Sequence, residues 1–158
     1  MEYGAQPLRR KSLRAGPLFR ALVAQFCENA QEKKCEISLE QSEQSEQAML
    51  CADRALLERL LENLLNNSIR HNPGRVSITV RTEAAGGCFC LTVADDGCGY
   101  PPAVLAAMNA PEPCENAPHI LGLHVVEQIA IAHGGKAEFA NNIPQGAKAV
   151  ISLPMELS

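Results

Sequence analysis

Apolar residues recur at helical spacing in two early stretches of the chain. Leu18, Phe19, Leu22, Val23 and Phe26 fall on one helical face, which predicts an amphipathic helix over about residues 16–33. A broader stripe of leucines predicts a second helix over residues 53–71. Asp53 is suited to cap the start of this second helix, and residues 72–74 (Asn-Pro-Gly) end it.

Apolar and polar residues alternate in several shorter stretches, which is typical of half-buried strands. The alternation predicts strands at residues 35–41, 76–80, 89–93, 136–141 and 147–153, with an edge strand at 48–51. Shorter helical patterns predict helices over 102–109 and 120–133, the second ended by Gly134 and Gly135.

Three stretches lack such a pattern. The first 15 residues have no clean period, residues 42–47 (SEQSEQ) are predicted to form a surface loop, and residues 110–118 are proline-rich and irregular. The order of the predicted elements indicates an α+β fold, a two-layer α/β sandwich. We expect a mixed, mostly antiparallel sheet with about three helices on one face.

Composition narrows the class of protein. The chain has 158 residues, enough for one domain, and its 46% hydrophobic and 20% charged residues are typical of a globular chain. The net charge of −4 argues against nonspecific binding to nucleic acid, which needs a basic face. No apolar run is long enough for a membrane span. The basic N-terminus is not followed by the apolar stretch of a secretory signal, so it is not expected to be one.

The chain contains seven cysteines, an odd number. Cys88 and Cys90 form a C-x-C pair whose side chains share one face of a predicted strand. We find no set of four ligands at the spacing of a zinc site. The simplest interpretation is reduced thiols that serve as small hydrophobic side chains in a cytosolic protein.

Asn63 and Asn67 are the first candidates for chemistry. They lie four positions apart, one turn from each other, at the edge of the leucine stripe. Amide oxygens suit Mg²⁺, and the nearby Arg70 could form paired hydrogen bonds to a phosphate. The alternative is that both asparagines are merely solvated or cap the end of the helix.

The second candidate is the Asp95-Asp96-Gly97-Cys98-Gly99 segment at the end of a predicted strand. Gly97 and Gly99 permit backbone conformations that other residues avoid. A carboxylate here could accept a hydrogen bond from the amino group of adenine, whereas guanine offers a carbonyl there. An ordinary Asp- and Gly-rich turn is the alternative, and a calcium loop would need more acidic positions.

The third candidate is the start of the helix predicted at 120–133, at Leu121, Gly122 and Leu123, because free amides at a helix N-terminus attract phosphate. A packing glycine would explain the same residues. The chain lacks a P-loop, a G-x-S-x-G elbow and an H-E-x-x-H motif.

Together, in this order and spacing, these segments resemble the ATP-binding catalytic domain of sensor histidine kinases, a group (GHKL, with the Bergerat fold) shared with DNA gyrase, Hsp90 and MutL. Residues 62–73 (ENLLNNSIRHNP) resemble its N-box and residues 95–102 (DDGCGYPP) its first glycine box. Residues 121–126 (LGLHVV) resemble its second glycine box. Asp53, Gly146 and the Leu153-Pro154 end also match family positions, so the resemblance covers nearly the whole chain.

The resemblance implies a role for each motif. Asp95 would bind the adenine amino group, Gly97 and Gly99 would shape the base pocket, and His71 would border the base. Asn67 would hold Mg²⁺ with help from Asn63. The residues expected near the phosphates are Arg70, Leu121, Gly122 and Leu123.

Two departures from the family pattern bear on activity. Ile120 stands where the second glycine box usually has its first glycine, and a β-branched residue does not easily take a positive φ. None of the four histidines is followed by an acidic residue, as the phosphoacceptor histidine of the family is. The acceptor would therefore lie on an upstream dimerisation domain.

The resemblance therefore implies a cytoplasmic, monomeric piece of a homodimeric kinase whose partner is a response regulator receiver domain. Residues 1–15 would be the tail of the upstream dimerisation helix and its linker, and 16–158 the catalytic domain. Neither nucleic acid nor direct membrane contact is expected. One alternative is a degenerate, non-catalytic docking module of the same fold. Another is an ATPase or serine kinase of the wider group, which usually carries Glu where this chain has Asn63.

Overall fold

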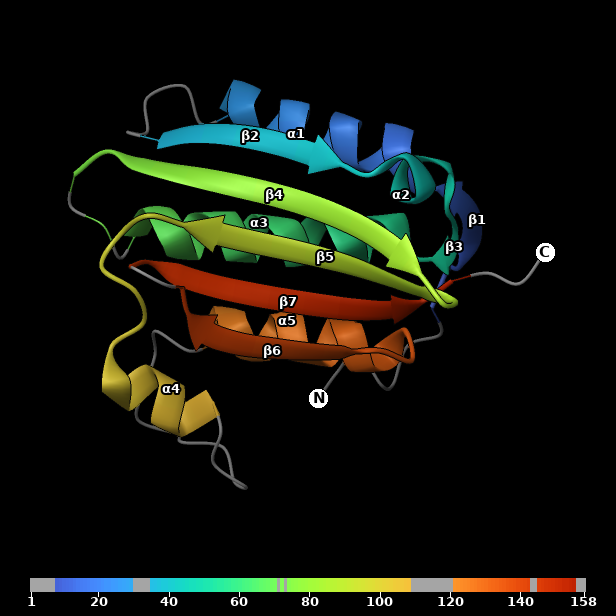
Figure 1. The fold of residues 1–158 in the computed structure, drawn as a ribbon. Helices are drawn as coiled ribbons and strands as arrows, with labels where there is room; N and C mark the ends of the chain where they lie inside the picture. Colours follow the sequence, from blue (N-terminus) through green and yellow to red (C-terminus); the bar gives the residue numbers. More distant parts are fainter. Residues whose placement is uncertain are drawn as a thin grey trace.

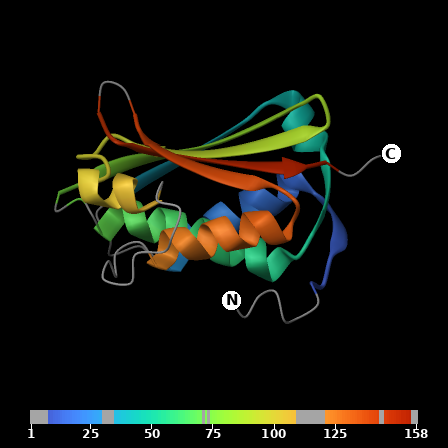
Figure 2. The same ribbon diagram turned by 90° about the horizontal axis from the view of Figure 1, so that it is seen from below.

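The protein folds as two layers, a sheet and a set of helices packed on one of its faces (Figures 1 and 2). The computed structural model describes residues 8–29, 35–70, 72, 74–108, 121–142 and 145–155. Five strands form the sheet in the order β2-β4-β5-β7-β6. Their bounds are Cys35–Gln41 for β2, Val76–Ala85 for β4, Cys88–Asp95 for β5, Ala147–Pro154 for β7 and Lys136–Asn141 for β6.

The pairing of the strands is mixed but mostly antiparallel. β2 runs parallel to β4, and every other neighbouring pair in this sheet is antiparallel. Side chains of β4, β5 and β7 alternate between buried and more exposed positions, so one sheet face lines the core and the other faces outward. The predicted α+β fold class is confirmed.

Three helices cover the inner face: α1 (Ala15–Asn29), α3 (Arg54–Arg70) and α5 (Leu121–Ala132) (Figure 2). The leucine stripe of α3 is buried, with Leu60 and Leu65 completely inaccessible. Asp53 caps α3 as predicted, because its Oδ1 accepts a hydrogen bond from the backbone N–H of Leu56 at 3.2 Å. α1 is described only to Asn29, and residues 30–34 lie outside the described residues.

The C-terminal end of α5 is tied to the start of α3. Gly134 ends the helix with φ +80°, as the sequence predicted. The buried His133 accepts a hydrogen bond at Nε2 from the Asp53 N–H at 3.0 Å, and its Nδ1 lies 2.8 Å from the Ile129 carbonyl oxygen. This imidazole therefore joins two helices that both reach the candidate site.

The prediction of a loop at residues 42–47 is wrong. Glu43–Gln47 form a short helix, α2, with Ser42 as its N-cap. Ser45 is completely buried, and its hydroxyl contacts the Thr82 hydroxyl at 2.7 Å and the Thr82 carbonyl at 3.0 Å. The capping bond and this attachment to β4 stabilise the helix.

Three short elements complete the described chain. Met49–Ala52 form β3, which confirms the predicted edge strand, and it pairs with β1 (Lys11–Arg14), a strand that no pattern predicted. Pro102–Met108 form α4, close to the predicted helix, beside β6 at one end of the sheet (Figure 1). Residues 110–118 lie outside the described residues. None of the described helices is long and apolar enough to cross a membrane.

Candidate functional site

Asp95 is the buried acidic residue of the site. It ends β5 on the helix-facing side of the sheet and is 4% exposed. Its Oδ1 accepts hydrogen bonds from the backbone N–H of Gly97 at 2.9 Å and from that of Ala147 at 3.1 Å. Both bonds that the described residues make to this carboxylate go to Oδ1, and none of them goes to Oδ2.

The neighbouring Asp96 has a different role. Its side chain accepts a hydrogen bond from the Ser77 N–H at 2.9 Å, and its own N–H donates to the Ser77 carbonyl at 3.2 Å. Gln145 Nε2 donates to the Asp96 carbonyl at 2.6 Å. Asp96 therefore holds the strand ends together, and Asp95 is the member of the pair that faces the interior.

The turn after Asp95 needs both of its glycines, for different reasons. A Cβ on Gly97 would lie 1.9 Å from the Asn72 Oδ1 atom, so the need is for space. Gly99 has φ +82°, in the left-handed region that glycine occupies without strain. Of the two glycines, only Gly99 therefore has a backbone conformation that other residues avoid, and Gly97 is needed for space.

Asn72 connects this turn to α3. Its Nδ2 donates to the Ser68 carbonyl at 2.6 Å, and its Oδ1 accepts from the Cys98 N–H at 2.9 Å. From the sequence alone, Asn72 is expected only to end the helix. The side-chain amide of Asn72 therefore fixes the position of the glycine turn relative to α3.

A second connection reaches the turn from β6. Asn141 Oδ1 accepts a hydrogen bond from the Tyr100 N–H at 2.7 Å. Tyr100 is buried, and its ring meets Phe139 edge-on with centroids 6.3 Å apart. Burial raises the pKa of the Tyr100 phenol far above its ordinary range, and the charge of the nearby Asp95 adds to the increase. Sequence patterns gave no signal for Asn141, which is 41 residues from Tyr100.

Asn63 and Asn67 lie one turn apart on α3. Asn67 is 7% exposed, and no hydrogen bond from the described residues occupies its amide. Asn63 Nδ2 donates to the Arg59 carbonyl at 2.9 Å, and a Cβ on Gly122 would lie 3.3 Å from Asn63 Oδ1. The first turn of α5 therefore packs directly beside Asn63.

The remaining predicted residues are spread around this end of the fold. Arg70 is exposed at the end of α3, and Leu121 begins α5. The Leu123 side chain is completely buried in the core, so only its backbone could meet a ligand. His71 lies outside the described residues, and so does Ile120.

A hollow of about 400 Å³ also lies at this end of the sheet. It is lined by Asp95 and by outward-facing residues, among them Ser77, Thr79 and Ala94. The side chains of Ser77, Thr79 and Ala94 point away from the helices, whereas that of Asp95 points toward them.

No metal cage is built into the described residues, which contain no group of three or more His, Cys, Asp or Glu side chains close enough to hold an ion. An ion bound at Asn67 would keep much of its hydration shell. This is the behaviour of Mg²⁺, which is usually bound through few protein oxygens and substrate phosphates.

Comparison with known proteins identifies the class. Residues 52–157 match the family model described as histidine kinase-, DNA gyrase B-, and HSP90-like ATPase. Because this match covers more than half of the chain, the chain belongs to that ATPase family. The resemblance predicted from the sequence motifs is confirmed.

Individual relatives narrow the class further. The histidine protein kinase DivJ of Caulobacter vibrioides is 29% identical over 113 residues, covering 68% of this chain and 19% of DivJ. The nucleotide-free catalytic domain of histidine kinase ThkA superposes with a TM-score of 0.78 at 21% identity, over 93% of this chain and 96% of that one. ThkA in complex with the response regulator TrrA gives a TM-score of 0.74 at 21% identity, over 93% of this chain and 42% of that one.

The chain is therefore the catalytic ATP-binding domain of the two-component sensor histidine kinase type. It spans about a fifth of the length of DivJ. The family and the fold are shown, whereas the roles of individual side chains rest on the geometry described above.

Proposed function

We propose that this chain holds Mg-ATP where α3, the turn after β5 and the first turn of α5 meet, and presents its γ-phosphoryl group to a histidine on an upstream dimerisation domain. The observation that carries the proposal is the Asp95 carboxylate. It is 4% exposed, its Oδ1 is fixed by two backbone N–H groups, and no bond from the described residues goes to Oδ2.

Asp95 would select the base. A carboxylate oxygen accepts a hydrogen bond from the 6-amino group of adenine, and it would face the carbonyl oxygen of guanine without a proton between them. Gly97 and Gly99 would bound the base through the turn that they allow. His71 would border the base, as the family resemblance implies.

The phosphate side would be held by α3 and α5. Asn67 would bind Mg²⁺ through its amide oxygen, with Asn63 assisting, and Arg70 would meet the phosphates. The α5 residues whose backbone N–H groups would face the phosphates are Leu121, Gly122 and Leu123. Mg²⁺, when bound, would neutralise the charge that develops on the transferring phosphoryl group.

The part played by the chain itself is then mainly positioning. An amide cannot accept a proton as a general base, so Asn63 would not activate water. In the transfer, an acceptor histidine nitrogen forms a bond to the γ-phosphorus, and the bond to the bridging oxygen of ADP breaks. The phosphoryl group would pass next to the receiver domain of a response regulator, as the ThkA–TrrA complex suggests by analogy.

The assembly belongs to the proposal as well. We infer that this domain by itself is a monomer, that the whole kinase is a homodimer, and that the domain works in the cytoplasm, where ATP is available. Neither nucleic acid nor a membrane surface would contact it directly. These statements rest on the family and on the acidic net charge of −4.

Thermal unfolding with Mg-ATP, with Mg-GTP and without nucleotide tests the proposal. A ligand at 100 times its dissociation constant stabilises the folded state by about 2.7 kcal/mol. We expect this stabilisation with Mg-ATP but not with Mg-GTP, and we expect Asp95→Asn to abolish it. EDTA, which removes Mg²⁺, should reduce the thermal shift that ATP produces in the parent chain. Asn67→Ala should reduce that shift by the same amount.

If millimolar Mg-ATP produces no shift, the nucleotide-binding proposal is wrong. A degenerate docking module of the same fold would then become the better account. The substitution Ile120→Gly, which restores the usual glycine, would in that case be expected to recover some binding.

Asn63→Glu tests the role of the amide. A glutamate here could act as a general base toward water, so we expect this variant to gain ATP hydrolysis that the parent chain lacks. Asn63→Gln, which keeps the amide, is the matched control and should not hydrolyse ATP. Appreciable hydrolysis by the parent chain would contradict the assignment.

A further inference from the structure

Two cysteines share one patch of the outer sheet face, opposite to the helices. Cys88 and Cys90 lie two positions apart on β5, both partly exposed and neither in a disulfide. Their neighbours Phe89 and Leu91 point the other way, into the core. The two sulfur atoms therefore lie on one surface, with a single inward residue between them.

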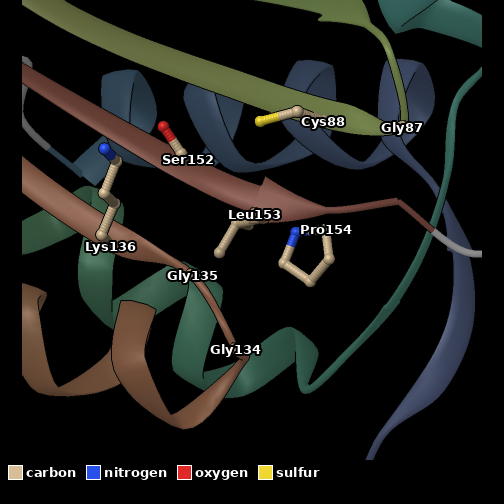
Figure 3. A pocket seen from close by; sticks show the side chains of 8 residues that line it. All are labelled: Gly87, Cys88, Gly134, Gly135, Lys136, Ser152, Leu153 and Pro154. Carbon is tan, nitrogen blue, oxygen red and sulfur yellow. The ribbon is translucent and has the colours of Figure 1, made fainter.

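Polar groups from two other strands face the same patch. Cys90 Sγ lies 3.8 Å from the Ser152 hydroxyl of β7, and the register places Lys136 of β6 directly beside Ser152. A hollow of about 390 Å³ lies beside Cys88 and is also lined by Lys136 and Ser152, whereas Cys90 lies outside it. In Figure 3, the Cys88 sulfur, the Ser152 hydroxyl and the Lys136 amine all lie over the outer surface of the sheet.

The two thiols also interact with each other. Burial raises the pKa of the Cys88 thiol, and the charge and hydrogen bond of Cys90 raise it further, whereas Ser152 and the positive charge of Lys136 act in the opposite direction. The hydrogen bond between the two thiols places their sulfur atoms close to each other.

We propose that Cys88 and Cys90 are the two ligands of a site for Cu(I) on the outer face of the sheet. Thiolates are soft ligands and select soft ions such as Cu(I). Zinc requires four ligands in a structural site, and the described residues offer no group of three or more His, Cys, Asp or Glu side chains. Cu(I) is satisfied by two thiolates, and the nearby Lys136 ammonium is already paired with Glu138 at 3.1 Å.

A disulfide fits the strand less well than an ion does. The Cβ atoms of residues two apart on a strand point to the same face and lie about 6.6 Å from each other, whereas a disulfide needs Cβ atoms about 3.5–4.5 Å apart. An ion between the sulfur atoms lengthens the connection by a second bond, of about 2.3 Å if it resembles a zinc–thiolate bond. The pair can therefore bind an ion without bending β5.

The site is independent of the proposed nucleotide site. Cys88 and Asp95 lie at opposite ends of β5, about 23 Å apart for a strand of this length, and on opposite faces of the sheet. Failure of nucleotide binding would therefore not affect this inference. Failure of Cu(I) binding would likewise not affect the proposed nucleotide site.

The test is an anaerobic titration of the reduced full chain with Cu(I) in competition with a chromogenic chelator. We expect one Cu(I) per chain to be held against the chelator. Cys88→Ser and Cys90→Ser should each weaken the binding by more than the roughly 10- to 100-fold that loss of an outer-shell partner costs. Ser152→Ala should fall within that smaller range.

The matched control is the double variant Cys27→Ser/Cys51→Ser, which removes two exposed thiols from elsewhere. It should bind Cu(I) as the parent chain does, and circular dichroism should show that every variant is folded. Unchanged binding in either single variant of the pair would overturn the proposal, and so would loss of binding in the control. Isolation of a Cys88–Cys90 disulfide from air-exposed protein in place of the copper complex would also overturn it.

Discussion

Comparison of Asp95→Ala with Asp95→Asn separates what this side chain does for the fold from what it does for a ligand. Asp95 Oδ1 accepts from two backbone N–H groups, those of Gly97 at 2.9 Å and Ala147 at 3.1 Å. Asparagine keeps an acceptor oxygen in the same place, whereas alanine leaves both donors unpaired. Since both variants lack the charge, the cost of burying a carboxylate cancels between them.

The size of the difference follows from burial. A buried donor left without a partner costs about 1–3 kcal/mol. The bond from Ala147 is fully buried and the bond from Gly97 only partly, so we expect Asp95→Ala to be about 2 kcal/mol less stable than Asp95→Asn. For a domain of this size, that free energy corresponds to a difference in Tm of about 4–8 °C.

Thermal unfolding without nucleotide, monitored by circular dichroism, measures this difference directly. Equal midpoints for the two variants would refute the reasoning. They would show that an acceptor oxygen for these two N–H groups adds nothing to the stability of the fold.

Three further substitutions test the packing of the fold. Ser45→Ala removes a buried hydroxyl that bonds to Thr82, so we expect a loss of about 1–3 kcal/mol in urea unfolding, and an unchanged midpoint would contradict the account of α2. A Cβ on Gly135 would lie 1.9 Å from a backbone oxygen of β7, so Gly135→Ala should cost about 1–3 kcal/mol, whereas Gly74→Ala, with open space around it, should not. The raised pKa of Tyr100 means that its neutral form stabilises the fold fully below pH about 10 and loses this contribution as pH rises toward the folded-state pKa. Tyr100→Phe should therefore resist alkaline unfolding better than the parent chain, and an unchanged alkaline midpoint would count against the burial argument.

The main elements could be predicted because their patterns are strong and local. The buried stripe of α3 runs along a helix of 17 residues with a capping Asp53 before it, and α5 is ended by Gly134, which has φ +80°. These signals are contained within a few neighbouring residues. No distant contact is needed to interpret them.

The elements that the sequence did not predict depend on distant contacts. α2 has only five residues, all polar, and it is held by the Ser45 hydroxyl against Thr82, which is 37 residues away. β1 has four residues with no alternation and exists through its pairing with β3. Local propensity carries little information about such elements, because tertiary contacts override it.

The candidate site divides in the same way. The side chains of Asn63, Asn67 and Asp95 could be singled out from motifs, because the chemistry belongs to those residue types. Their supports could not be predicted, since Ala147 is 52 residues from Asp95 and acts through its backbone N–H. Asn72 acts through an amide that crosses to Cys98, 26 residues away.

The most direct test of the central claim is a double-mutant cycle on the contact between Asp95 and the adenine amino group. Calorimetry would measure the binding of ATP and of its analogue lacking the 6-amino group, purine riboside triphosphate, to the parent chain and to Asp95→Asn. We predict that the parent chain prefers ATP by about 1.5–3 kcal/mol, the value of a hydrogen bond to a charged group, and that Asp95→Asn loses this preference. An equal preference for ATP in both proteins would contradict the account, because the amino group would then be recognised elsewhere.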